Sequence, residues 1–200
     1  MIRHQTRLND LLGSRICHDL ISPIGAIGNG IELLAMSGAT TGAEMELISE
    51  SVENANARIR YFRIAFGAAG SGQDIARSEA VAVLSEMFRD SRMHVAWLPE
   101  TDLPRSRVKL NFLLFLCFES ALPRGGAVSL SSVGDGTAIY AEADMLRFDE
   151  NLWALLADAG RQSPPLAPAT VHFALAGLCA QDLGLTLSVE RSQNSLRVRY

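Results

Sequence analysis

Apolar side chains recur every three or four residues through two neighbouring segments in the first third of the chain. In chain order, the two sets are Leu20, Ile24, Ile27, Ile31 and Leu34, then Met45, Ile48, Val52, Ala55, Ile59, Phe62 and Phe66. Heptad spacing of this kind keeps each set on one side of an α-helix. Between the sets, Gly38 can end the first helix, and Thr41 with Glu44 can cap the second. We therefore expect residues 1–70 to form an antiparallel helical hairpin.

A lone hairpin with two continuous apolar stripes would leave much of its apolar surface in water. At about 25 cal/mol per Å², such exposure is hard to sustain in a soluble protein. Two hairpins that pair into a four-helix bundle remove it, so we expect a homodimer. The alternative is that the hairpin packs on the rest of its own chain.

The sequence pattern changes after the stretch GAAGSGQD, and we place a second domain at residues 76–200. Helices are expected at SEAVAVLSEMFRD, RSRVKLNFLLFLCFESAL, DENLWALLADAG and ATVHFALAGLCAQDLG. Strands are expected at RMHVAWLP, on both sides of the Gly-Asp-Gly turn at 134–136, and as a closing pair in LTLSVERSQNSLRVRY. This order predicts an α+β sandwich with helices on one face of a mixed sheet. A chain that is 48% apolar and 20% charged can supply its core.

A histidine lies in the middle of the first predicted helix, outside the apolar stripe. His18 is two residues from both Ile16 and Leu20, so it points about 200° away from them around the helix. The residues expected on its face are Ser14, Arg15, Ser22, Gly25 and Asn29. Most of them are small, so a large partner can approach the ring. We expect Arg15, Ser22 and Gly25 to dock that partner, although a lone surface histidine is most often only solvated.

Two neighbours of His18 favour a chemical role for it. Asp19 can hold one ring nitrogen protonated, which leaves the other nitrogen as the nucleophile. Pro23 lacks an N–H group and crowds the carbonyl of Asp19, at a cost of roughly 3 kcal/mol in a helix interior. We expect this proline to shape the helix just after the histidine. His18 and Asp19 are therefore the candidate catalytic residues, and Pro23 is a candidate helix-shaping residue.

The pattern His-Asp-Leu-x-x-Pro at residues 18–23 resembles the H-box of the dimerisation and phosphotransfer domain of sensor histidine kinases. Residues 78–200 follow the element order of the kinase ATP-binding domain. The stretch RICHDLISPIGAIGNGIELL, the length of 200 residues and the absence of a sensor segment resemble the ChpT-type histidine phosphotransferases of alphaproteobacteria. The resemblance implies a dimeric phosphotransfer hairpin followed by a histidine-kinase-like ATPase fold.

The sequence departs from the kinases where they bind ATP. Leu116 and Ser120 stand where the resemblance places two asparagines, and AEADMLRFDEN has no glycine where an adenine-binding turn is expected. GRQSPPLAPAT replaces the glycine-rich lid, and prolines lack the N–H groups that a phosphate nest needs. We expect a degenerate ATP-binding-like domain without a nucleotide site. At 164–168 we expect a plain connector rather than a PxxP ligand. The chain is expected to bind no cofactor.

The resemblance then implies a phosphorelay protein. His18 would accept a phosphoryl group from the receiver domain of a CckA-like hybrid histidine kinase and pass it to CtrA-like or CpdR-like response regulators. Mg²⁺ is expected from the receiver domain, because this sequence has no carboxylate cluster for it. The alternatives are a non-catalytic module that binds receivers or kinases, and an unusual active histidine kinase.

Two arginines of the second helix complete the predicted site. Arg60 and Arg63 lie about as far from the turn as His18 does, beside the apolar seam. With Arg15 they are expected to form a basic rim for an acidic receiver domain. The alternative is that all three are solvated side chains.

The remaining features of the sequence restrict the function further. A net charge of −4 without long runs of one sign favours neither nucleic acid nor a membrane as a partner. No long apolar run and no signal-peptide pattern occur, so we expect a cytoplasmic protein. Cys17, Cys117 and Cys179 are expected to be buried thiols. His94 is expected to face solvent, and His172 to be a structural residue of an apolar helix.

Overall fold

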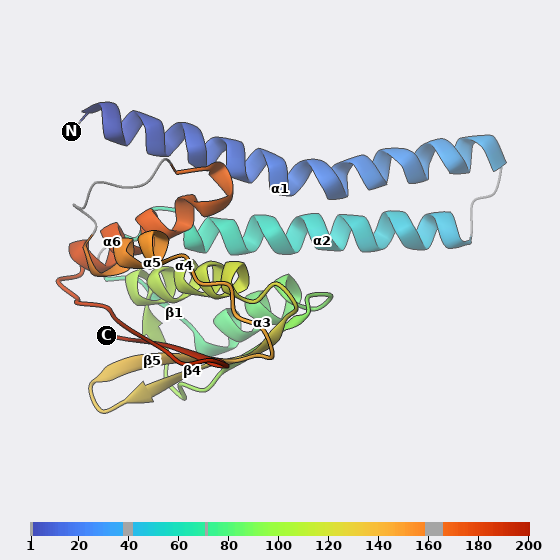
Figure 1. Cartoon of the computed structure of the whole chain (residues 1–200). Coiled ribbons are helices and arrows are strands. Elements are labelled where there is room, and N and C mark those ends of the chain that lie inside the picture. The colour runs from blue at the N-terminus through green and yellow to red at the C-terminus, as the bar shows by residue number, and fades with distance from the viewer. Residues whose placement is uncertain (1, 38–41, 71, 159–165) are drawn as a thin grey trace.

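The computed structural model of the chain describes residues 2–37, 42–70, 72–158 and 166–200. Two long helices, α1 (Ile2–Ser37) and α2 (Ala43–Ala65), lie side by side and run in opposite directions (Figure 1). This arrangement confirms the predicted hairpin. The end signals at Gly38 and Thr41 lie outside the described residues.

The apolar stripes of the hairpin divide between two faces. Ala55 and Phe62 of α2 are buried, and Leu20 and Ile27 of α1 are half-buried. The exposed members of the stripes are Ile24, Ile31, Met45, Val52 and Ile59. Packing of α1 on α2 therefore covers only part of the heptad pattern, and a row of aliphatic side chains remains in contact with water.

Helix α1 continues through Pro23, whose side chain is buried. The helix changes direction near its middle (Figure 1). A proline inside a helix causes such a bend, because it removes one hydrogen bond and crowds the preceding turn.

Residues 74–200 form the α/β part of the chain, in the element order that the sequence predicts. Its main elements are α3 (Arg77–Met87), β2 (Met93–Trp97), α4 (Arg105–Ala121), β4 (Gly126–Val133), β5 (Gly136–Glu142), α5 (Glu150–Ala157), α6 (Val171–Asp182), β6 (Ser188–Arg191) and β7 (Ser195–Arg199). Three short elements were not predicted: β1 (Asp74–Ile75), β3 (Leu103–Pro104) and the 3-10 helix η1 (Pro168–Thr170).

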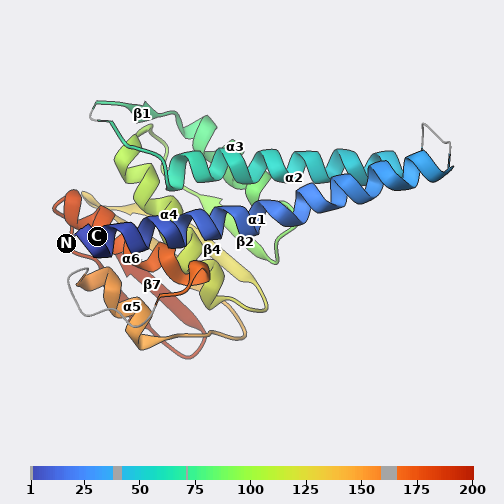
Figure 2. The same cartoon turned by 90° about the horizontal axis from the view of Figure 1, so that it is seen from above.

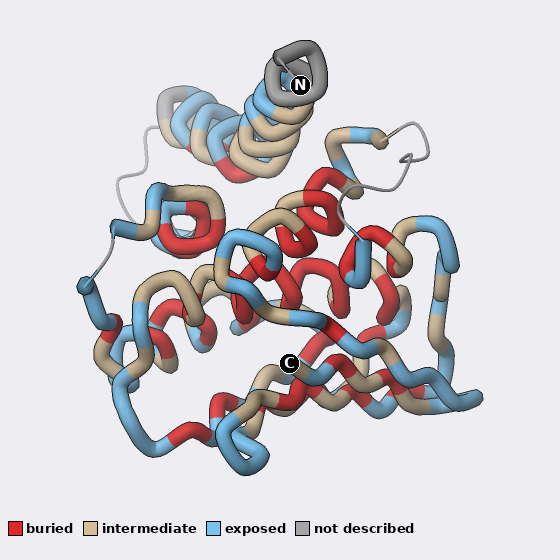
Figure 3. The backbone as a smooth tube through the Cα atoms, turned by 90° about the vertical axis from the view of Figure 1, so that its left-hand side faces the viewer, coloured by how far each residue is buried: buried red, intermediate tan, exposed pale blue. Residues whose placement is uncertain are grey.

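The five longer strands form one mixed sheet in the order β2-β4-β5-β7-β6, in which only β2 and β4 are parallel. Val133 pairs with Gly136 across the β4–β5 turn, where Gly134 has a positive φ of 57°. The helices cover one face of the sheet, and the buried residues lie between the two layers (Figure 3). In β2, Met93 and Trp97 are buried and His94 is exposed, as predicted. The predicted α+β fold is confirmed.

The hairpin shares a hydrophobic core with the α/β part. Tyr61 of α2 is fully buried, stacks on Phe112 of α4 with ring centroids 4.7 Å apart, and donates a 2.7 Å hydrogen bond to its carbonyl. Ile64 and Ala65 are buried in the same core. The alternative that the hairpin packs on its own chain is therefore correct for this end of α2.

The other end of the hairpin extends past the α/β part, as Figures 1 and 2 both show. The exposed aliphatic residues of the stripes include Ile31 and Met45, which flank the turn between α1 and α2. The α/β part therefore leaves this end of the hairpin uncovered.

Candidate functional site

His18 projects from α1 with 85% of its side chain exposed. Its Nδ1 lies 3.2 Å from Oδ1 of Asp19. Ser22 and Gly25, one and two turns further along the helix, are also exposed. A Cβ atom added at Gly25 would meet nothing within 4 Å, so the surface beside the ring is smooth and open.

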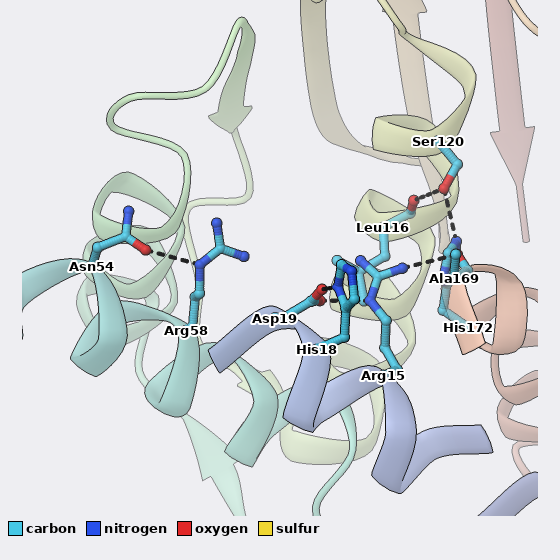
Figure 4. Close-up of polar contacts among 9 residues, drawn as sticks. All are labelled: Arg15, His18, Asp19, Asn54, Arg58, Leu116, Ser120, Ala169 and His172. Carbon is cyan, nitrogen blue, oxygen red and sulfur yellow. Dashed lines mark hydrogen bonds and ion pairs between the residues drawn. The ribbon is translucent and has the colours of Figure 1, made fainter. Parts of the chain in front are cut away.

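The two residues that support His18 are much less exposed than the histidine. The side chains of Asp19 and Arg15 are 11% and 16% exposed. Nε of Arg15 donates a 2.5 Å hydrogen bond to Oδ2 of Asp19, and its Nη1 donates a 2.8 Å bond to the carbonyl of Ala169 in η1 (Figure 4). The exposed ring of His18 thus contacts Asp19, and Asp19 is in turn bound by Arg15; both of these side chains are largely buried.

This geometry distinguishes the two ring nitrogens of His18, because only Nδ1 faces Asp19. A carboxylate only accepts hydrogen bonds, so its contact with Nδ1 favours the form of His18 that carries the proton there. Nε2 then keeps its lone pair and is the nitrogen available to a partner. A positive charge that develops on the ring during reaction would be stabilised by Asp19.

The charge of Arg15 also acts on two residues of the α/β part, Glu119 and His172. Burial raises the pKa of Glu119, and the positive charges of Arg15 and Arg58 oppose that rise. Burial, together with Arg15, lowers the pKa of His172 to about 3. The hydroxyl of Ser120 donates to the carbonyl of Leu116 at 3.0 Å, so His172 donates its Nε2 proton to that hydroxyl at 3.1 Å. His172 is therefore a neutral structural residue, as predicted.

The sequence relates this chain to proteins of known class. A family model described as the histidine phosphotransferase C-terminal domain matches residues 77–195. The protein phosphotransferase ChpT of Brucella abortus (strain 2308) is 37% identical over 195 residues, which cover 94% of this chain and 92% of that protein. The chain belongs to the histidine phosphotransferase family.

Comparison with a solved phosphotransferase structure agrees with this assignment. A solved bacterial phosphotransferase matches this histidine phosphotransferase with a TM-score of 0.78 at 35% identity, over 97% of this chain and 95% of that one. The histidine kinase AdeS of Acinetobacter baumannii matches more weakly, with a TM-score of 0.45 at 11% identity over 91% of this chain and 95% of that one.

Each of the three predicted docking arginines of this histidine phosphotransferase lies near a carboxylate of its own chain. Arg60 contacts Glu86 of α3 at 3.0 Å, and Arg63 lies 4.0 Å from Glu79 of the same helix. Arg15 is held internally, as described above. The carboxylates of α3 attract the two arginines of α2, and spacing along α2 alone does not predict these contacts.

Arg58 of α2, whose charge acts on the buried Glu119 as that of Arg15 does, was not predicted from the sequence. Its Nε donates a 2.8 Å hydrogen bond to Oδ1 of Asn54, and its charge acts on Glu119 (Figure 4). Arg58 is four residues before Phe62 and three after Ala55, both buried members of the stripe. That spacing was a signal that this arginine faces inward.

The positions expected to have lost nucleotide contacts serve the core of the α/β part. Leu116 is buried, and Ser120 bonds to His172. Phe148, from the segment without glycine, stacks on Trp153 with centroids 5.3 Å apart. A groove of about 430 Å³ remains beside them and is lined in part by Arg15, Glu119, Arg147 and Thr170. Of the proline-rich segment GRQSPPLAPAT, residues 160–165 lie outside the described residues.

One prediction about the cysteines is wrong. Cys17 is exposed, whereas Cys117 is buried and Cys179 is half-buried. Cys17 lies four residues before Ile21 and seven before Ile24, which are 68% and 59% exposed, so it belongs to the uncovered apolar side of α1. Apolar neighbours in the sequence did not distinguish this side from the packed one.

Among the described residues, no helix is long and apolar enough to cross a membrane. No group of three or more His, Cys, Asp or Glu residues in the same part of the chain is arranged to hold a metal ion.

Proposed function

We propose that this chain is the phosphotransfer protein of a phosphorelay and carries the phosphoryl group on His18. The observation that carries the proposal is the exposed imidazole whose Nδ1 faces Asp19 on an open helix surface. The donor is the receiver domain of a CckA-like hybrid histidine kinase, and the acceptors are CtrA-like and CpdR-like receiver domains.

The reaction is an in-line exchange of the phosphoryl group. Nε2 of His18 attacks the phosphorus of an aspartyl phosphate, an N–P bond forms, the O–P bond breaks, and the donor aspartate leaves as a carboxylate. The positive charge on the phosphorylated ring is balanced by Asp19 at 3.2 Å. The second transfer reverses these steps on the acceptor aspartate. Because phosphoryl transfer depends on position and charge stabilisation, Mg²⁺ of the receiver domain supplies what this chain lacks.

The active form is proposed to be a homodimer in which two hairpins make a four-helix bundle. The exposed aliphatic residues of α1 and α2 support this proposal, because they extend the buried stripes in heptad spacing. His18 lies outside that row and stays accessible when it is covered.

Transfer is proposed to need no ATP on this chain. The support is that Leu116, Ser120 and Phe148 pack or hydrogen-bond within the α/β part and offer no paired amides for a metal. Phosphate would then enter only from a phosphorylated receiver domain.

A reconstituted relay tests the proposal. A phosphorylated donor receiver, this chain and an acceptor receiver are mixed without ATP, and the label on the acceptor is followed over time. Wild type is expected to transfer the label, and His18→Gln is expected to reduce transfer to the level seen without the chain. Transfer by the His18→Gln variant would refute the assignment. If wild type and His18→Gln both bind the receiver domains but neither transfers the label, the binding-module alternative would be supported.

A further inference from the structure

Arg15 connects the helix that carries His18 to the α/β part. Its Nε donates to Oδ2 of Asp19 at 2.5 Å, and its Nη1 donates to the carbonyl of Ala169 at 2.8 Å. These two residues are far apart in the sequence and belong to different layers of the molecule. Because the guanidinium group is planar and rigid, two such bonds fix its orientation.

The carbonyl that holds Arg15 is itself firmly placed. It belongs to η1, where the N–H of Thr170 donates to the carbonyl of Ala167 at 3.0 Å and its hydroxyl bonds to the backbone of the same residue. Two residues after Thr170, His172 is buried and bonds to Ser120 of α4. The position of η1 is therefore tied to the core of the α/β part.

The same contacts restrict the carboxylate of Asp19. With Oδ2 bound by Arg15, rotation about the last side-chain bond of Asp19 would break a charge-assisted hydrogen bond, and Oδ1 stays directed at Nδ1 of His18. The bond to Asp19 in turn sets the tautomer of the histidine. Figure 4 shows this series of residues from Ala169 through Arg15 to Asp19 and His18.

We propose that Arg15 is a positioning residue through which the α/β part fixes the Asp19–His18 pair for phosphoryl transfer. The inference rests on the proposed function and assigns a role to the α/β part: it holds the reactive helix in register with η1. Arg15 acts through Asp19 and does not contact the phosphoryl group.

The test compares Arg15→Gln with wild type by three measurements. These are the rate of transfer from a phosphorylated receiver at saturation, the affinity for that receiver, and the tautomer of His18 from the ¹⁵N chemical shifts of its ring. Arg89→Gln is the matched control, since Arg89 also connects the hairpin to the α/β part, through a 2.8 Å contact with Glu53, away from His18.

Arg15→Gln is expected to slow saturated transfer roughly 10- to 100-fold, because small displacements of reacting groups cost that much. It should also reduce the population of His18 protonated on Nδ1, while the affinity for the receiver stays within about 2-fold. Arg15→Lys keeps a positive charge near Asp19 but cannot make both hydrogen bonds in one plane. Its transfer rate should therefore lie between those of wild type and Arg15→Gln. Arg89→Gln should match wild type in all three measurements.

Two outcomes would overturn the inference and leave the proposed function intact. In one, the Arg15→Gln tautomer and rate both equal those of wild type. In the other, receiver affinity falls as much as the rate while the tautomer is unchanged, which would make Arg15 a docking residue. If Arg15→Gln does not fold, Arg15→Lys decides by the same three measurements. Absence of transfer in wild type would instead contradict the proposed function.

Discussion

Around His18, the exposed face of α1 combines small residues with open space. Ser22 is exposed, and a side chain at Gly25 would enter solvent. A tryptophan at either position should therefore leave the fold intact and hold a receiver domain away from the ring. We predict that Ser22→Trp and Gly25→Trp each slow transfer by roughly 100-fold, with melting temperatures close to that of wild type.

Ser85→Trp is the control for this prediction. Ser85 is also an exposed helical serine, but it lies in α3. Its replacement should leave the transfer rate unchanged. Transfer at the wild-type rate by both α1 variants would show that the receiver approaches from elsewhere.

His172 gives the folded chain a defined dependence on pH. Its pKa is about 3 in the folded chain against 6.5 in the unfolded chain, because it is buried. Between these values the unfolded chain binds the additional proton, so the free energy of unfolding falls as the pH falls from 6.5 towards 3. From pH 7 to pH 5, His172 alone should remove about 2 kcal/mol.

Urea unfolding of wild type and His172→Gln at pH 7 and pH 5, at one protein concentration, measures this effect. The variant is expected to be less stable than wild type at pH 7. Because glutamine does not titrate, its free energy of unfolding should fall by about 2 kcal/mol less between pH 7 and pH 5. An equal loss in both proteins would contradict a buried neutral His172.

Among the elements, the hairpin offers a way to separate dimer formation from folding. Ile31 is 55% exposed in the single chain, so Ile31→Asp should leave the hairpin folded. In a four-helix bundle the same carboxylate would be buried without a partner, at a cost of several kcal/mol. We predict that Ile31→Asp weakens association at least about 100-fold. Light scattering and sedimentation measure the result.

Asn29→Asp is the matched control, because it adds the same charge to an exposed polar position two residues away. It should associate like wild type. Ile27 is less informative, since it is half-buried and an aspartate there would also disturb the hairpin. A wild-type chain that is monomeric at all concentrations would reject the bundle.

The elements that the sequence predicted are those with strong local patterns. The heptad stripes defined α1 and α2, and alternation with a glycine turn defined β4 and β5. The strand pair β1–β3 and the helix η1 are short and depend on partners distant in the sequence. The proximity of Arg58 to Glu119 could not be predicted for the same reason, since it arises only when α2 packs on α4.

At the scale of the whole molecule, the α/β part is expected to position the reactive residues of the hairpin. It holds Arg15 through η1, and we propose that it supplies no nucleotide. Magnesium ATP should then give no stabilisation. A ligand present at about 100 times its Kd would raise stability by about 2.7 kcal/mol, which is a clear shift in melting temperature. A reproducible shift at millimolar nucleotide would reopen the kinase alternative.

Locating the phosphoryl group on the chain tests most directly whether His18 carries it. The chain is incubated with a phosphorylated receiver domain, kept at neutral to basic pH, digested and examined by mass spectrometry. We predict one acid-labile, base-stable phosphoramidate, on His18, in wild type and none in His18→Gln. A phosphoryl group on another residue, or none on a wild-type chain that binds the receiver, would contradict the account.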